Sequence, residues 1–305
     1  METLRLIQFR AAYNLPIHAA VEQGIFARHG LALEIAYTPG SAFVCRALKD
    51  GGADIGFTAA DDIIADVEAD RRSDLFMFMG LHGGLFTLVS APNVNTVEAL
   101  ANSTIGVDAK NTGFVLVLEK FLNDRGLPRG RYDLIEIGGW ERRYTALSEG
   151  KISATLLTEP FLSNALAAGC HLLARDLEMI PAYQGTVGAA SRAWAERHRD
   201  LLLRFMRGYV EATQWCFERA HHEACLAILG RHSGVTGSAA DKTLEALLHP
   251  QRGLYPKAEL NIAGVRAAMA LRAELGYLSQ PIPRAKKYCD LSYYQEALSK
   301  VDASD

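Results

Sequence analysis

The first 62 residues alternate between short apolar runs and longer runs with helical periodicity. The short runs predict strands at residues 4–9, 31–37 and 53–58, and the periodic runs predict helices at 17–30 and 46–52. Turns rich in small residues separate these elements. Each predicted strand ends at a turn that exposes backbone N–H groups at a sheet edge, which is where open α/β sheets bind small ligands.

The same alternation begins again near residue 96, after apolar segments around Gly83 and Gly84 that are long enough to cross between two lobes. A capped helix starting at Thr96 is predicted to open this second unit. Further strands and helices are predicted in turn at 103–108, 114–126, 133–139, 142–150, 154–161, 162–169 and 171–176. A return strand at 185–191 and a long amphipathic helix at 195–215 follow.

The length of the chain favours two separate hydrophobic cores. Its 305 residues, of which 49% are hydrophobic and 22% charged, exceed what one core usually serves. The pattern therefore predicts an α/β protein with parallel sheets and two lobes.

Small residues recur at spacings that resemble a known family. The first set is Ala20, Gly24, Phe26, Gly30 and Leu31, followed by Gly40, Ala47, Leu48, Gly52 and residues 53–56. A second match is the segment GGWERRYTALSEGKISATLLTEP at residues 138–160. The chain from residue 4 to about 217 resembles the substrate-binding proteins of ABC importers for nitrate, sulfonate, taurine and thiamine precursors.

This resemblance implies a two-lobed type II periplasmic-binding-protein fold, in which parallel-rich sheets are flanked by helices and a ligand cleft lies between the lobes. Lobe one would comprise residues 1–88 and 188–305, and lobe two residues 89–187. The chain would cross between lobes near residues 84–90 and again near 185–190. The C-terminal helices would pack back on lobe one.

Candidate ligand-binding residues lie where the predicted strands end, because free N–H donors and short hydroxyls there can grip a polar solute. The candidates are Tyr13, Asn14, Gly40, Ser41, Thr58, Asp61, Asn111, Thr112, Gly113, Trp140, Glu159 and Tyr183. For Ser41, Thr58 and Thr112, a role as helix N-caps is an equal alternative, and one residue can serve both roles.

Three aromatic residues lie beside these turns, and aromatic rings are common stacking platforms in a cleft. Trp140 stands between a Gly-Gly pair and three polar residues, so we expect it in the cleft, in a loop and not under a helix. Tyr183 is assigned to the same cleft. Phe43 is assigned to the hydrophobic core.

The charged residues near the strand ends bear on the class of ligand. The acidic ones are Asp61, Asp62, Asp108 and Glu159, and the candidate cations are Arg10, Lys110, Arg142 and Arg143. Acidic groups in the first turn of a helix use the positive dipole end that an anion would need. This favours a neutral or cationic, partly aromatic solute over nitrate or sulfonate. The alternative is that Asp61 and Asp62 are ordinary helix-start residues that face water.

Other classes of partner and site find little support. The net charge is −3, and no basic cluster interleaved with aromatic residues indicates nucleic acid. His221 and Cys225 stand four apart on one helical face but lack further ligands of matching spacing, so no metal site is predicted. Neither a cofactor nor a catalytic residue is predicted, because nucleotide-binding and hydrolase motifs are missing. The five cysteines contain no CxxC pair, and Cys216 falls on an apolar helical stripe typical of core.

Two functions remain open. The first is a non-catalytic, monomeric binding protein that captures a small organic molecule between its lobes and delivers it to an ABC permease. The second is a cytosolic enzyme or ligand-responsive protein on the same fold, acting on a small organic substrate such as a heteroaromatic one. We favour the first, because no catalytic constellation is visible. The expected localisation is periplasmic if a leader has been removed, and cytoplasmic if Met1 is the native start.

Overall fold

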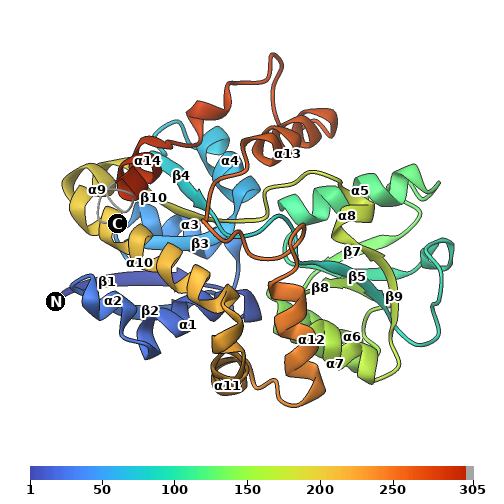
Figure 1. Ribbon diagram of the computed structural model, residues 1–305. Helices are drawn as coiled ribbons and strands as arrows, with labels where there is room; N and C mark the ends of the chain where they lie inside the picture. The colour runs from blue at the N-terminus through green and yellow to red at the C-terminus, as the bar shows by residue number, and fades with distance from the viewer. Residues whose placement is uncertain (300–305) are drawn as a thin grey trace.

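The computed structural model describes residues 1–299 and contains two mixed sheets in separate halves of the molecule (Figure 1). The first sheet, which defines lobe one, has the spatial order β2 (Leu31–Tyr37), β1 (Glu2–Gln8), β3 (Ile55–Ala59), β10 (Thr186–Ser191) and β4 (Leu75–Gly80). The second sheet, which defines lobe two, has the order β7 (Asp133–Glu136), β6 (Thr104–Val107), β8 (Ala154–Leu157), β5 (Thr87–Ser90) and β9 (His171–Arg175).

One strand of each sheet runs against its neighbours. β1 pairs in parallel with β2 and β3, and β6 pairs in parallel with β7 and β8. β10 is antiparallel to β3 and β4, and β5 is antiparallel to β8 and β9. β5 is the first strand after the chain enters lobe two, and β10 is the first after it returns. Residues 81–86 and 180–185 are therefore the two connectors between the lobes.

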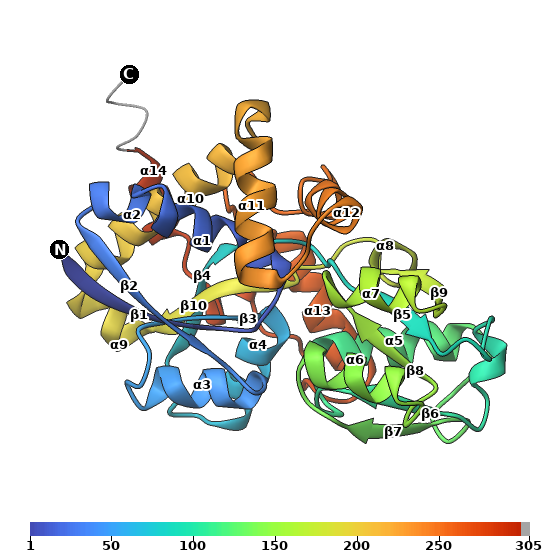
Figure 2. The same ribbon diagram turned by 90° about the horizontal axis from the view of Figure 1, so that it is seen from below.

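The apolar runs of lobe one form buried strands because helices cover both faces of its sheet. Every residue of β3 and β4 is buried. One face packs against α1 (Leu15–Glu22), α2 (Ile25–Arg28), α10 (Arg199–Phe217) and α14 (Ser292–Ser299). The other face packs against α3 (Ser41–Lys49) and α4 (Ala60–Ala69), as Figure 2 shows. The short α9 (Arg192–Arg197) follows β10.

Lobe two contains the helices predicted from its pattern. They are α5 (Gly113–Asp124), α6 (Trp140–Ser148) and α7 (Phe161–Ala167). The short α8 (Asp176–Met179) was not predicted. One prediction is wrong: the helix expected from Thr96 is a single 3-10 turn, η2 (Glu98–Leu100). Thr96 Oγ1 does accept the N–H of Ala99 at 3.2 Å. The turn ends there because Asn102 adopts a left-handed backbone conformation, φ 59°, and leads directly into β6.

The C-terminal helices contact both lobes, whereas the prediction placed them on lobe one. They are α11 (His222–Ser233), α12 (Ser238–Leu247) and α13 (Ile262–Glu274) before α14, with 3-10 turns η1 (Ala12–Asn14), η3 (Arg219–His221) and η4 (Ala285–Lys287) elsewhere. α11 packs on α1, but α12 also contacts α7, and α13 contacts α4 of lobe one and α5 of lobe two. A continuous buried cluster beneath α13 includes Ile63 of α4 and Leu116 of α5.

Both predicted lobe boundaries fall inside strands: residue 88 lies in β5 and residue 188 in β10. The division at those residues stays a prediction, and residues 300–305 of its last segment lie outside the described part of the chain. Cys216 is buried, as predicted for a core residue. None of the described helices is both long and apolar enough to span a bilayer.

Candidate ligand-binding site

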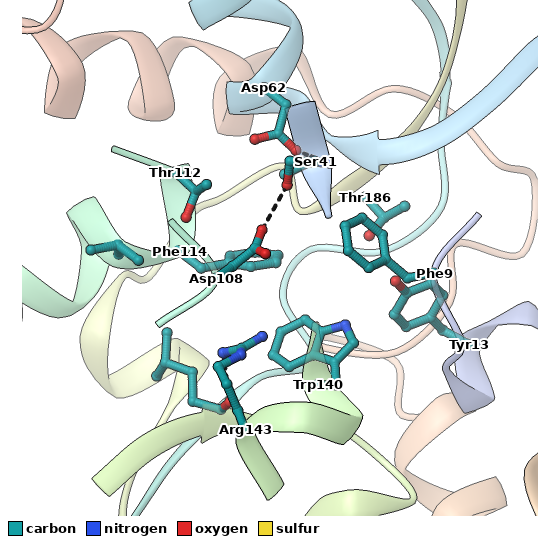
Figure 3. A pocket seen from close by; sticks show the side chains of 13 residues that line it. Phe9, Tyr13, Ser41, Asp62, Asp108, Thr112, Phe114, Trp140, Arg143 and Thr186 are labelled. Atoms are coloured by element: carbon teal, nitrogen blue, oxygen red, sulfur yellow. Dashed lines mark hydrogen bonds between the residues drawn. The ribbon is translucent and has the colours of Figure 1, made fainter. Parts of the chain in front are cut away.

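A pocket lies between the two sheets, where strands of both lobes end (Figure 3). Its empty space, including the opening to solvent, is about 460 Å³. It is lined by Phe9, Tyr13, Ser41, Ala59, Asp62, Asp108, Thr112, Phe114, Val115, Trp140, Arg143, Leu156 and Thr186. Residues just after β1 and β6, and at the ends of β3 and β8, therefore meet in one place.

Asp62 provides the carboxylate of the lobe-one wall. Its Oδ2 accepts the hydroxyl of Thr58 at 2.6 Å and the N–H of Ala59 at 3.1 Å, which fixes the side chain at the start of α4. Burial raises the pKa of Asp62 to about 6, and the nearby Asp108 carboxylate acts in the same direction. The site thus holds an acidic group whose charge is poorly solvated.

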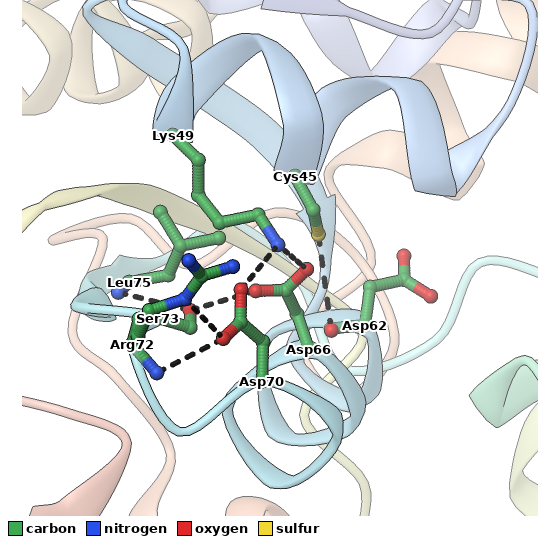
Figure 4. Close-up of polar contacts among 8 residues, drawn as sticks. All are labelled: Cys45, Lys49, Asp62, Asp66, Asp70, Arg72, Ser73 and Leu75. Carbon is green, nitrogen blue, oxygen red and sulfur yellow. Dashed lines mark hydrogen bonds and ion pairs between the residues drawn. The ribbon is translucent and has the colours of Figure 1, made fainter.

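A network of polar contacts fixes α3 against α4 behind this wall (Figure 4). Lys49 Nζ lies 2.7 Å from Asp66 and 3.7 Å from Asp70, and the thiol of Cys45 points to the carbonyl oxygen of Asp62 at 3.8 Å. The end of α3 is therefore held against the end of α4, and the middle of α3 against the first turn of α4, where Asp62 lies.

Arg143 and Trp140 on α6 form much of the lobe-two wall. Arg143 is only 4% exposed, and its Nε and Nη1 donate to the carbonyl oxygens of Gly138 and Leu156, each at 2.9 Å. Its guanidinium carbon lies 4.3 Å from the centre of the Trp140 ring. Within residues 1–299, no carboxylate lies within 4 Å of this guanidinium. Burial lowers the pKa of Arg143 to about 10, so the side chain remains a cation at neutral pH.

One hydrogen bond joins the two lobes across the pocket. The hydroxyl of Ser41, at the start of α3, donates to Asp108 Oδ2 of lobe two at 2.9 Å (Figure 3). Tyr13 connects the pocket to the first connector, because its ring centre lies 4.7 Å from that of His82. Burial raises the pKa of Tyr13 to about 12, so it lines the pocket as a neutral phenol.

The sequence of the NMT1-like family matches residues 2–230, which is most of the chain. The chain belongs to this family. No curated protein matches it.

Three solved structures share the fold of this NMT1-like protein over nearly its whole length. The ligand-binding component of an ABC-type import system from Staphylococcus aureus, with zinc bound, has a TM-score of 0.80 and 15% identity, covering 97% of this chain and 99% of its own. The alkanesulfonate-binding protein SsuA from Xanthomonas axonopodis pv. citri, bound to MOPS, has a TM-score of 0.78 and 17% identity, covering 94% and 98%. The periplasmic nitrate-binding protein NrtA from Synechocystis PCC 6803 has a TM-score of 0.78 and 12% identity, covering 99% and 89%. The predicted periplasmic-binding-protein fold is confirmed.

Six of the predicted site residues lie at the pocket or its outer rim. Tyr13, Ser41, Thr112 and Trp140 line the pocket itself. Gly40 and Asn111 line an adjoining outer groove, to which Ser41 and Thr112 also contribute. Whether any of these residues binds a ligand stays a prediction.

The other six predicted residues line neither cavity and have partners within the protein. Asn14 donates to the carbonyl oxygen of Phe9 at 2.6 Å, and Asp61 pairs with Arg272 at 2.6 Å. Glu159 Oε2 accepts the N–H of Ser163 at 3.1 Å. Thr58 holds Asp62, Gly113 begins α5, and Tyr183 packs against Phe86 and Phe114. A ligand-binding role for these six also stays a prediction.

The alternative of an N-cap position is wrong for Ser41 and Thr58 and right for Thr112. Ser41 follows the N-cap position of α3 and donates to Asp108, and Thr58 donates to Asp62. Thr112 does occupy the N-cap position of α5, but its hydroxyl donates to the carbonyl oxygen of Ala109 at 3.1 Å.

Three further expectations need correction. Phe43 is 45% exposed, because the buried stripe of α3 runs through Val44, Cys45 and Leu48 and leaves Phe43 outside it. Asp61 and Asp62 do not face water, since α13 and lobe two cover the start of α4. Trp140 lines the pocket, but it begins α6 and is 6% exposed, so it is not in a loop.

Sequence reasoning missed part of the pocket. Asp62, Asp108 and Arg143 were considered only as nearby charges, and Phe9, Phe114, Val115, Leu156, Thr186 and Ala59 were not considered. Arg143 could have been found, because it stands three residues after Trp140 and so lies on the same face of a helix. His221 and Cys225, whose spacing was noted, make separate contacts: His221 stacks on Trp215, and the Cys225 thiol points to the carbonyl oxygen of Cys216.

Proposed function

We propose that this NMT1-like protein captures a small organic solute between its lobes and hands it to an ABC permease. The observation that carries the proposal is the origin of the pocket walls. Ser41 and Asp62 come from lobe one, whereas Asp108, Trp140 and Arg143 come from lobe two. A solute in this pocket contacts both lobes at once.

Such a solute favours the closed arrangement, because its contacts to both walls exist together only when the lobes meet. The bond between Ser41 and Asp108 adds to that closure. Movement of the lobes is accommodated by the connectors at residues 81–86 and 180–185. The permease then distinguishes the closed, loaded form from the open one.

Delivery to a permease is supported by the structural neighbours that are components of ABC importers. Our proposal includes a periplasmic location and a monomeric state. Fractionation of cells that express the native gene tests the location, and light scattering during gel filtration tests the oligomeric state. Uptake of the solute by cells that lack the gene tests delivery.

A binding experiment tests the pocket itself. Native mass spectrometry of freshly purified protein, followed by a thermal-shift screen of amines, pyrimidines, amino acids, sulfonates and carboxylates, identifies a solute. At ~100 times its Kd, a single-site solute stabilises the protein by about 2.7 kcal/mol. Thr112→Tyr, which fills the pocket, should abolish this shift. Thr145→Tyr, the same change on the exposed face of α6, should retain it. Equal shifts in both variants would place the solute elsewhere.

A further inference from the structure

At the acidic end of the pocket, Oδ1 of Asp62 and Oδ1 of Asp108 accept no hydrogen bond from residues 1–299, although Oδ2 of each carboxylate does. Asp62 and Asp108 approach each other from opposite lobes, and the Ser41 hydroxyl lies between them (Figure 3). One hydroxyl has one proton, which it donates to Asp108, so it cannot satisfy both carboxylates. Closure of the lobes therefore brings two like charges together and leaves one oxygen of each carboxylate without a donor. A nitrogen group with several N–H bonds would supply what is missing.

The α6 wall has the opposite deficiency. Nε and Nη1 of Arg143 are bonded to carbonyl oxygens, and no hydrogen bond of Nη2 to the described residues is recorded. A buried guanidinium without a carboxylate is costly unless an anion or another acceptor joins it. Since Arg143 is 4% exposed and extends into the pocket, an oxyanion of the solute would complete its contacts.

Aromatic side chains line much of the same pocket. Phe9, Tyr13, Phe114 and Trp140 all line the pocket, and the Phe114 and Trp140 rings lie 5.8 Å apart. Flat apolar walls favour a flat solute over a branched one. The charges of Asp62, Asp108 and Arg143 leave the pocket with an excess of one negative charge, which disfavours a purely anionic solute.

On the basis of the proposed function, we infer that the solute is a small, planar, dipolar molecule. It carries a protonated nitrogen that binds between Asp62 and Asp108, an aromatic body, and an oxyanion that binds Arg143. Aminoalkyl-substituted aromatic acids are the simplest members of this class. The inference assigns specificity to three residues: the two aspartates for the cationic end and the arginine for the anionic end.

Three probes of one shape test the inference by calorimetry: 4-(aminomethyl)benzoate, benzylamine and benzoate. The dipolar probe should bind at least roughly tenfold more tightly than either singly charged probe. Asp108→Asn should weaken the dipolar probe and benzylamine but leave benzoate unchanged. Arg143→Met should weaken the dipolar probe and benzoate but leave benzylamine unchanged. Circular dichroism checks that each variant is folded. If Arg143→Met does not fold, Asp108→Asn, at a half-buried site, tests the inference by itself.

Two results overturn the inference: benzoate binding as tightly as the dipolar probe, or no binding of any of the three at millimolar concentration. If the solute screen nevertheless identifies another molecule whose binding Thr112→Tyr abolishes, the proposed function stands and only the solute class is wrong. If the screen also finds no solute, the proposed function fails with it.

Discussion

The buried ion pair between Asp61 and Arg272 should stabilise the protein by fixing α13 over the junction of the lobes. Arg272 Nη1 lies 2.6 Å from Asp61 Oδ2, and the two side chains are 5% and 1% exposed. The same nitrogen donates to the carbonyl oxygen of Asn111 in lobe two at 3.4 Å. Arg272→Met leaves the Asp61 carboxylate buried without a partner, which should cost about 3–5 kcal/mol of unfolding free energy. This cost is a large fraction of the total unfolding free energy of a typical folded protein, which is about 5–15 kcal/mol.

A double-mutant cycle measured by urea unfolding tests this reasoning. Asp61→Asn should also be costly, whereas the double variant should cost clearly less than the sum of the two, because no unpaired buried charge remains. Lys151→Met, which breaks an exposed ion pair with Glu149, is the control and should cost less than about 1 kcal/mol. If each single change at the buried pair also costs less than that, or if the two costs simply add, the pair does not have this role.

The pH dependence of Arg272→Met gives a second check. Burial raises the pKa of Asp61 to about 7, although the Arg272 guanidinium acts against this. A carboxyl group with a raised pKa in the folded state binds its proton more tightly there, so its contribution to stability increases as the pH falls from 7 towards 4. Loss of the guanidinium raises the pKa of Asp61 further, so the deficit of Arg272→Met should shrink as the pH falls towards 7 from the alkaline side and change little below pH 7. A deficit that is constant with pH would contradict the assignment.

Three further results are expected. Trp140→Ala should lower the unfolding free energy by about 3–5 kcal/mol, because the side chain is buried. Trp140→Phe should lower it by less. Urea unfolding measures both changes, and unchanged stability would contradict the burial of Trp140. Burial lowers the pKa of His82 to about 3, so the unfolded state gains a proton first, and stability through this group should decrease by about 2 kcal/mol between about pH 6.5 and pH 5. His82→Gln should remove that dependence and the exposed-site control His222→Gln should not. Ser41→Ala removes the bond to Asp108 and should weaken solute binding by about fivefold, or about 1 kcal/mol, in calorimetry; an unaltered affinity would show that the bond does not assist closure.

Local sequence patterns predicted most of the fold because its strands are short apolar runs bounded by small residues. β3 and β6 follow directly from such runs, and the restart of the alternation near Thr104 predicts the second sheet. The contacts of α13 could not be predicted in this way. Arg272 meets Asp61 across 211 positions, and no local periodicity shows which helix a distant arginine reaches.

Pocket-lining residues could be predicted only where the end of a nearby strand fixes their position. Tyr13, Ser41, Thr112 and Trp140 lie four or five residues after the ends of β1, β2, β6 and β7 and do line the pocket. Asp61 also lies at the start of a helix that follows a strand, but its side chain points towards Arg272 of α13. The side chain of the next residue, Asp62, lines the pocket. The direction in which a side chain at a helix start points depends on packing between elements, which the pattern of one strand and one helix does not contain.

The central claim is that a solute in the pocket between the lobes holds them together. Small-angle X-ray scattering of the protein with and without the solute identified by the screen tests it most directly. The radius of gyration should decrease when the solute is added, towards the value calculated from this structure, and Thr112→Tyr should show no decrease. An unchanged radius of gyration in the saturated wild-type protein would contradict capture by closure of the lobes.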